Sequence, residues 1–401
     1  MQFLRVLKIR FYFKRNSLLW CFFTEIIAKC LVSLLANLFS MISQNSNKAV
    51  IYWLLTGCGL VYLMVVIGCI TRLTHSGLSI TDWSFMGSMP PLSEDAWLER
   101  FAKYQQSPEF IKVNYSMQLP EFKHIFFWEY FHRMVGRTMM YVFAIGLIIL
   151  IIRKKINKQM LPSLILLFFM GAMQAVIGWW MVYSGLQAKP AVSHFRLATH
   201  LMSAFTLFAF TFWFALKLLN PKEETSTSSV TSNEGHKLKW WSLLFFIVLI
   251  KQIIYGAFTA GYVEGDAAKI RPGQIFNTWP KMGDEWMPEQ VTMKESFFAN
   301  VMENASGIQF MHRTLAILVC VVLCVIWYKS SKLKLNASQY RGVTFLIYGV
   351  TLQFIFGVLT LLYHVPVVLG VLHQTGAFFL FATSVYLIFH TFRKNPNEQI
   401  V

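Results

Sequence analysis

Long apolar segments alternate with short polar ones along most of this 401-residue chain. Eight of the apolar segments come close to or exceed the roughly 20 residues that a helix needs to cross a bilayer core. We therefore expect membrane-spanning helices over residues 49–71, 125–152, 160–185, 194–217, 239–262, 306–328, 342–363 and 367–391. Such a chain is an all-α, polytopic membrane protein with eight transmembrane helices.

The second half of the chain repeats motifs of the first half. The third, fifth and seventh spans share Gln-x-x-x-Gly, the second and sixth share His-Arg, and the fourth and eighth share a histidine followed by a small residue and Ala-Phe. The offsets between matching positions are similar: 180 from His132 to His312, 179 from Gln174 to Gln353 and 173 from His200 to His373. This indicates a duplicated four-helix unit. We expect two pseudo-symmetric four-helix bundles, in residues 49–217 and 239–392.

Composition agrees with a membrane protein. Hydrophobic residues make up 56% of the chain and charged residues only 14%, whereas about a quarter of a soluble domain is charged. The formal net charge of +17 comes largely from short connections, as the positive-inside rule expects, and so does not indicate nucleic-acid binding. These basic residues are Arg153, Lys154, Lys155, Lys158, Lys217, Lys222, Lys237, Lys239, Lys329, Lys332, Lys334, Arg341, Arg393 and Lys394.

The charge pattern also predicts the orientation in the bilayer. With both termini in the cytoplasm, the basic connections fall on one side, including the linker 218–238 and the tail 393–401. The two long connections, 72–124 and 263–305, then lie outside. Each mixes acids, bases, proline and tryptophan, so we expect partly ordered caps.

Residues 1–48 are basic and only moderately apolar, so they predict no regular span. A targeting segment, an interfacial helix and sequence upstream of an alternative start at Met41 are all compatible with this pattern. The six cysteines have apolar surroundings and are interpreted as small buried side chains. The chain contains no C-x-x-C-H, which gives no indication of covalent c-type haem.

Four histidines are the candidate functional residues, because polar side chains inside a membrane are usually functional. His132, His200, His312 and His373 lie six or seven residues inside the outer ends of their spans, a depth of roughly 10 Å. Two facing imidazoles in a four-helix bundle suit six-coordinate haem iron. Hydrogen bonding between helices is the alternative for any single histidine.

Two further patterns are compatible with a flat ligand. The residue four positions after each histidine is small, which leaves room for a macrocycle edge or for close helix packing: Gly136, Ala204, Ala316 and Ala377. Four arginines near the outer helix ends could pair with haem propionates, or extend to lipid headgroups: Arg133, Arg137, Arg196 and Arg313.

A bare-metal site of the zinc or di-iron type is the competing interpretation. Glu129-x-x-His132 has the spacing of carboxylate di-iron bundles. Those sites require a second copy and two more glutamates, but the second copy here reads Gln309-x-x-His312. We therefore favour haem.

The difference between Glu129 and Gln309 makes the two halves unequal. A carboxylate one turn from a haem ligand is expensive to bury, and electron transfer alone does not require it. This favours chemistry in the first half and a permanent cofactor in the second. A glutamate that packs against the outer connection is the alternative.

Several motifs, in order, resemble those of the haem A synthase family over about residues 49–392. They are Thr71-Arg72-Leu73-Thr74, Ser76-Gly77-Leu78-Ser79, Glu129-Tyr130-Phe131-His132-Arg133, Asn277-Thr278-Trp279-Pro280, Gln309-Phe310-Met311-His312-Arg313, and the histidines of the fourth and eighth spans.

The resemblance implies oxidation of the C8 methyl of haem O to a formyl group by successive hydroxylations, giving haem A for terminal oxidases. It implies that His312 and His373 ligate a resident haem b, through which electrons leave. His132 and His200 would face the haem O substrate, and Glu129 would act as a base or stabilise an electron-poor intermediate. Haem O synthase, assembly factors of the terminal oxidase and further copies of the chain are the partners it suggests.

This chain departs from part of the family in having no cysteine in residues 72–124, so a thiol relay in that connection is not supported. The compact loops favour a bacterial cytoplasmic (inner) membrane, with the mitochondrial inner membrane as the alternative. Two other functions remain open: a di-haem b-type electron carrier between quinol and an outer partner, and a transporter with structural histidines.

Overall fold

The computed structural model describes residues 42, 45–82, 90–187, 190–220, 234–264 and 271–393. The regular structure in these ranges is helical, with one isolated β-bridge between Met282 and Glu285. The interpretations of nearly all of the N-terminal extension, most of the 218–238 linker and the tail after Arg393 lie outside the described residues.

The eight predicted spans are confirmed, because eight helices among the described residues are long and apolar enough to cross a membrane. They are α2 (Lys48–Leu73), α5 (Leu119–Ile152), α6 (Leu161–Gly185), α7 (His194–Leu219), α8 (Lys239–Gly261), α11 (Ala305–Ser330), α12 (Ala337–Leu362) and α13 (Val367–Phe392). A short 3₁₀ helix, η1 (Gly235–Leu238), leads directly into α8.

Two helices begin earlier than their apolar segments suggest. Helix α5 starts six residues before the predicted position, where Gln118 and Glu121 form a capping box. Helix α12 starts five residues early at the capping box of Asn336 and Gln339. Hydropathy marks only the part of a helix that can lie in lipid. The helix can begin before that part, at a position where side chains accept hydrogen bonds from its first N–H groups.

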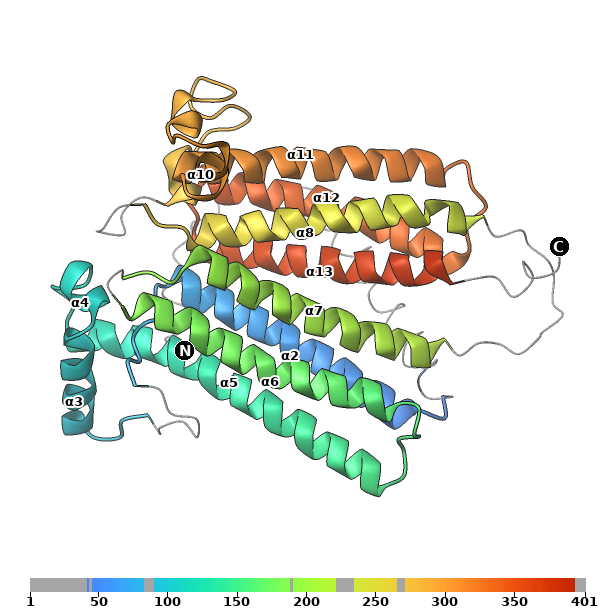
Figure 1. Cartoon of the computed structure of the whole chain (residues 1–401), viewed down its shortest axis with the longest axis horizontal. Coiled ribbons are helices and arrows are strands. Elements are labelled where there is room, and N and C mark those ends of the chain that lie inside the picture. Colours follow the sequence, from blue (N-terminus) through green and yellow to red (C-terminus); the bar gives the residue numbers. More distant parts are fainter. Residues whose placement is uncertain are drawn as a thin grey trace, which may run out of the picture.

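The spanning helices form two neighbouring groups (Figure 1). In the first group α2 contacts α5 and α7, and α6 contacts α5 and α7; in the second, α8 contacts α11 and α13, and α12 contacts α11 and α13. Helices α7 and α2 join the groups through contacts with α8 and α13. The same helix pairs therefore meet in both halves, and the pseudo-symmetry of the two bundles stays a prediction.

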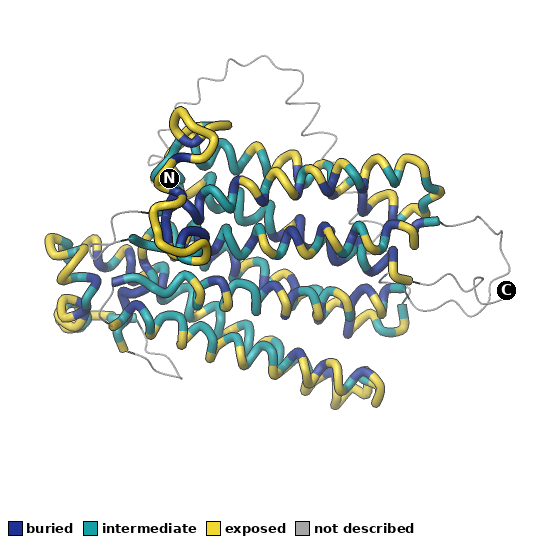
Figure 2. The backbone as a smooth tube through the Cα atoms, turned by 45° about the horizontal axis from the view of Figure 1, so that its top comes forward, coloured by how far each residue is buried: buried dark blue, intermediate teal, exposed yellow. Residues whose placement is uncertain are grey.

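Burial differs strongly among the spanning helices. In the most apolar part of α2 44% of the residues are buried inside the protein, compared with 6% in α5. Figure 2 shows exposed residues along the outward faces of the peripheral helices. One large apolar cluster contains residues of both groups, including Phe205 of α7 and Phe378 and Phe381 of α13, whose rings pack together. The two halves thus share a core.

Both long connections contain short helices at the same end of the molecule (Figure 1). The first contains α3 (Glu94–Gln105) and α4 (Pro108–Lys112); the second contains α9 (Pro272–Ile275), η2 (Glu289–Thr292) and α10 (Phe297–Met302). The side-chain oxygens of Ser93 and Ser107 accept hydrogen bonds from backbone N–H groups in the first turns of α3 and α4, which caps both helices. Gly307 lets α10 approach α11, because a Cβ there would lie 1.9 Å from the carbonyl oxygen of Asn300. The expected caps are therefore ordered in their described parts.

Candidate functional site

Each of the four histidines lies against a glycine of a neighbouring helix. The helix pairs are α5 with α2, α7 with α6, α11 with α8 and α13 with α12. A Cβ placed on the glycine would lie within van der Waals contact of the ring or closer: 3.3 Å for Gly68 and His132, 2.9 Å for Gly178 and His200, 3.4 Å for Gly256 and His312, and 2.9 Å for Gly357 and His373. Glycine therefore creates the space in which each imidazole lies between two helices.

Three of these glycines end the Gln-x-x-x-Gly motif, and the glutamine of each motif reaches the same histidine. The side-chain nitrogens of Gln174, Gln252 and Gln353 lie 3.2, 3.4 and 3.5 Å from a ring nitrogen of their histidines. The spacing of four residues explains this, because the glutamine and the glycine lie on the same face of the helix. The motif, recognised in the sequence only as a repeat, forms the support of the histidines.

The rings of the second pair, His312 and His373, lie close together. The ring centres are 6.4 Å apart and the ring planes are inclined at 77°. Metal–imidazole bonds are about 2.0–2.1 Å long for zinc, so rings on opposite sides of one ion have centres roughly 6–7 Å apart. The Nδ1 atom of each ring is buried without a hydrogen-bond partner among the described residues. Unsatisfied buried nitrogens on two facing rings fit an iron porphyrin, which needs only two protein ligands.

The first pair, His132 and His200, lies on α5 and α7, which both pack against α2 and α6. In the part of the chain that the structure describes, no group of three or more His, Cys, Asp or Glu side chains is placed to share a metal ion. Any iron held here would therefore draw its other ligands from a bound macrocycle.

Glu129 lies one turn outward from His132 on α5 and is only 3% exposed. Its Oε2 accepts hydrogen bonds from the Ser79 hydroxyl (2.7 Å) and the Ile80 N–H (2.9 Å). Its Oε1 pairs with Arg133 at 2.5 Å, and Arg133 also donates to the Ile80 carbonyl at 3.2 Å. The carboxylate thus holds the Ser-Gly-Leu-Ser segment of the first outer connection over α5, and both of its oxygens are fixed.

Gln309 and Arg313 have the corresponding task on α11. The Gln309 amide donates to the Phe276 carbonyl at 3.0 Å. Arg313 donates to the carbonyls of Phe276 (2.7 Å), Thr278 (2.9 Å) and Lys281 (3.1 Å), which surround the cis Trp279–Pro280 bond. Both halves therefore use residues three before and one after the histidine to hold an outer connection, but only the first uses a negative charge.

The predicted arginines have protein partners of different kinds. Arg133 and Arg313 bind outer connections, and Arg196 donates to the Trp180 carbonyl at 2.8 Å with its guanidinium over the indole ring. Arg137 lies one turn further along α5 than Arg133. Contact of these side chains with propionates remains a prediction.

A charged cluster joins the two outer connections. Arg271 donates a hydrogen bond to the His75 ring at 2.7 Å. Partial desolvation of this surface-exposed ring, together with the positive charges of Arg271 and Arg72, lowers the pKa of His75, so the ring is neutral at physiological pH. Arg72 donates to the carbonyls of Ala260 and Gly261 at 2.7 and 3.4 Å, which ties the end of α2 to the end of α8.

A buried carboxyl group lies in the first connection. Glu109 of α4 is 8% exposed and accepts a hydrogen bond from the Tyr104 hydroxyl at 3.1 Å. Asn114 donates to the same hydroxyl at 2.7 Å. Burial raises the pKa of Glu109 to about 7, opposed by the Tyr104 hydrogen bond and reinforced by the charge of Glu129.

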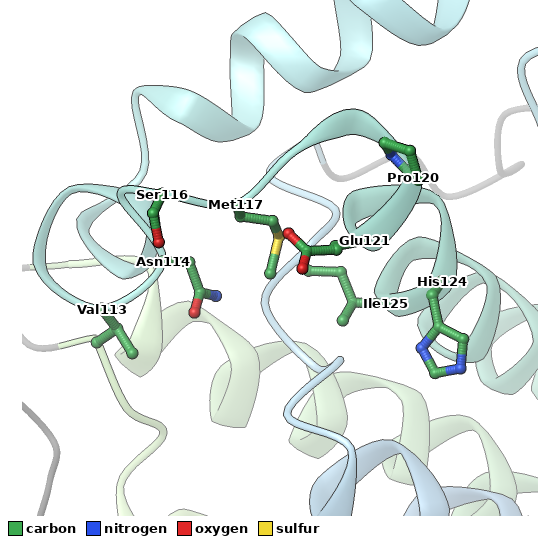
Figure 3. Close-up of a pocket in the computed structure, with 8 residues that line it drawn as sticks. All are labelled: Val113, Asn114, Ser116, Met117, Pro120, Glu121, His124 and Ile125. Atoms are coloured by element: carbon green, nitrogen blue, oxygen red, sulfur yellow. The ribbon is translucent and has the colours of Figure 1, made fainter.

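A pocket of about 540 Å³ lies beside this cluster, where α4 is followed by α5 (Figure 3). Its lining consists of Val113, Asn114, Ser116, Met117, Pro120, Glu121, His124 and Ile125. The pocket does not contain any of the four intramembrane histidines. It belongs to the outer cap and not to the interior of the helix groups.

The eight-helix architecture defines a polytopic membrane protein of the helix-bundle type, and the two histidine pairs are its candidate functional site. This chain belongs to the COX15-CtaA family, described as cytochrome oxidase assembly protein, whose match covers residues 51–385. It is 44% identical to the Heme A synthase of Flavobacterium psychrophilum over 88% of this chain and 100% of that protein. It is 42% identical to the Heme A synthase of Flavobacterium johnsoniae over 86% of this chain and 98% of that protein. The Heme A synthase COX15 of Arabidopsis thaliana is 39% identical, over 87% of this chain and 76% of that protein.

Replacing Glu109 by glutamine tests the buried carboxyl group. The folded-state pKa of about 7 lies above the ordinary value of 4.5, so ionisation removes stability as pH rises from about 4.5 through 7, and the loss is complete above that range. Glu109→Gln does not ionise. Its melting temperature relative to wild type should therefore increase between pH 5 and pH 8 in detergent. Glu99→Gln, at a solvent-exposed position of α3, is the control. An identical difference at both pH values for Glu109→Gln would contradict this assignment.

Proposed function

We propose that this protein is a haem A synthase, which oxidises the C8 methyl group of haem O to a formyl group by two successive hydroxylations. Each hydroxylation replaces a C–H bond by a C–O bond to a water oxygen and releases two protons and two electrons, and the electrons leave through the second site to an external electron acceptor. The diol formed by the second hydroxylation loses water to give the formyl group. The observation that carries the proposal is the inequality of two otherwise matched sites. Both histidine pairs have the same glycine support, but Glu129 closes the first and Gln309 closes the second.

The second pair is the resident cofactor site. His312 and His373 would hold haem b. Their Nδ1 atoms are buried without a hydrogen-bond partner among the described residues, which supports this assignment. Haem b supplies one-electron redox chemistry when bound. Gln309 and Arg313 use their hydrogen bonds to keep the second outer connection closed over the site, which excludes water from it.

The first pair would bind the iron of haem O through His132 and His200. The connection of residues 79 and 80 covers the outer end of this site and is held by Glu129. A fixed carboxylate in a dry site stabilises positive charge that develops on a neighbouring carbon, and it can also accept a proton. Ser79, Ile80 and Arg133 orient the two oxygens, so the group needs little reorganisation during the reaction.

A di-haem b-type electron carrier is the second candidate function. The equal packing of all four histidines against glycine favours it, because a pure carrier needs two similar sites. It gives no reason for a buried carboxylate in only one of them.

The surroundings follow from the same assignment. The substrate is haem O and the product haem A, so a haem O synthase and assembly factors of a terminal oxidase are the expected partners. Further copies of the chain are compatible with this assignment.

We place the protein in the bacterial cytoplasmic membrane with both termini in the cytoplasm, or in the mitochondrial inner membrane. The basic connections between α5 and α6 and between α11 and α12 lie at the end opposite the caps, which supports this orientation (Figure 1).

Co-expression with a haem O synthase tests the proposed function. Haems extracted from the cells should include haem A, identified by chromatography. Cells that express the haem O synthase without this protein should contain haem O and no haem A. Folded, haem-loaded protein that never yields haem A would contradict the proposal. Haem b in both sites would then favour the electron carrier.

Glu129→Gln separates the chemical role of Glu129 from its structural role. Glutamine removes the charge but keeps the size and can still accept from Ser79, Ile80 and Arg133, whereas alanine would remove all of these hydrogen bonds. Haem A formation by Glu129→Gln should fall about 100-fold or more, with the haem b spectrum retained. Wild-type activity in this variant would mean that Glu129 only anchors the outer connection.

A further inference from the structure

The supports of the four histidines differ at one position. On α6, Gln174 donates to the backbone carbonyl of His200 at 2.9 Å and lies 3.2 Å from its Nδ1. The other end of the Gln174 amide accepts from the Ser203 hydroxyl, which also donates to the His200 carbonyl at 2.9 Å. His200 is therefore fixed through its ring and through its backbone.

The second half has this arrangement at Gln353 and the ring contact alone at Gln252. Gln353 donates to the His373 carbonyl at 2.9 Å and lies 3.5 Å from the ring. Gln252 lies 3.4 Å from the Nε2 atom of His312. Both members of the resident pair thus have a glutamine at the edge of the ring.

Helix α2 carries the glycine but not the glutamine. Gly68 lies against His132, and the position four residues before it is occupied by Met64. The Met64 methyl group packs on α5 one turn further into the helix, 3.5 Å from where a Cβ of Gly136 would lie. Among the described residues, no side chain forms a hydrogen bond with the His132 ring, unlike the other three.

This exchange changes how firmly the ring is held. An iron-bound imidazole donates its free ring N–H, and an acceptor outside the coordination shell then fixes the ring; loss of that acceptor typically weakens metal binding by about 10- to 100-fold. A glutamine amide can turn its oxygen to the ring to accept this hydrogen bond, and the Oε1 atoms of Gln252 and Gln353 have no other partner among the described residues. A methionine thioether is at most a weak acceptor, and its chain is flexible. His132 can therefore turn about its side-chain bonds at less expense than His200, His312 or His373.

The proposed reaction requires such a difference. A resident cofactor stays in place through many turnovers, but a substrate porphyrin must enter and its product must leave in each one. Release is easiest when one of the two axial bonds breaks first. The site whose porphyrin is exchanged in each turnover is then the site with one loosely held histidine.

We propose that Met64 makes His132 the releasable axial ligand of the substrate porphyrin, and that Gln174, Gln252 and Gln353 are positioning residues that fix the other three histidines. This inference rests on the proposed function and deepens it. Its ligand class is an iron porphyrin that exchanges during turnover, held firmly from the α7 side and loosely from the α5 side.

Met64→Gln restores the missing glutamine and tests the proposal. A new hydrogen bond to His132 should slow loss of the first-site haem from detergent-purified protein to apohaemoglobin or another haem acceptor by about 2- to 10-fold. The absorbance of that haem should become more completely low-spin, and haem A should accumulate on the protein. Leu63→Gln, which places the same amide on an exposed position of α2, should leave haem loss at the wild-type rate.

The reciprocal variant is Gln252→Met at the resident site. It should lose haem b about 10- to 100-fold faster than wild type and show a high-spin fraction. Met64→Gln with unchanged haem loss, or Gln252→Met with unchanged retention of haem b, would overturn the proposal. These measurements follow haem binding and not product. If the protein binds haem but makes no haem A, the proposed function is refuted, but the haem-loss measurements still test the proposal about Met64 and His132.

Discussion

The close approach of a glycine to each histidine is the contact on which the site depends. An imidazole between two membrane helices needs space that any side chain on the facing helix would fill, and at Gly178 and Gly357 a Cβ would lie 2.9 Å from the ring. The glycines therefore set the separation of four helix pairs. The glutamine one turn away is then brought to the edge of the ring, so helix packing and the orientation of the histidine are determined by the same motif.

The spans and their number could be predicted because hydropathy acts over long stretches of sequence, and the repeat predicted that His312 and His373 lie near each other. The start of α5 could not, because the capping box at Gln118 and Glu121 lies outside the apolar segment. The partners of Glu129 could not be predicted either, since Ser79 is 50 residues away and is brought close only by folding. The fourth copy of the histidine support was hidden, because Met64 replaces the glutamine that identifies the other copies.

Duplication explains the similarity of the halves, and a few substitutions explain how they can differ in task. Gln309 and Glu129 both hold an outer connection, so the replacement of amide by carboxylate preserves the cap while placing a charge beside the first site. Met64 and Gln252 both fill the space one turn from a glycine, but only the amide reaches the histidine. Both changes fall in the first half, where a substrate must react and be exchanged.

The central claim is that one pair of histidines holds a cofactor and the other a substrate. The most direct test is the haem content of protein purified from cells that make haem b but no haem O. We predict a single haem b per chain, retained when His132 and His200 are both replaced by alanine and lost when His312 and His373 are. Haem that is lost with the first pair and retained without the second would contradict this account.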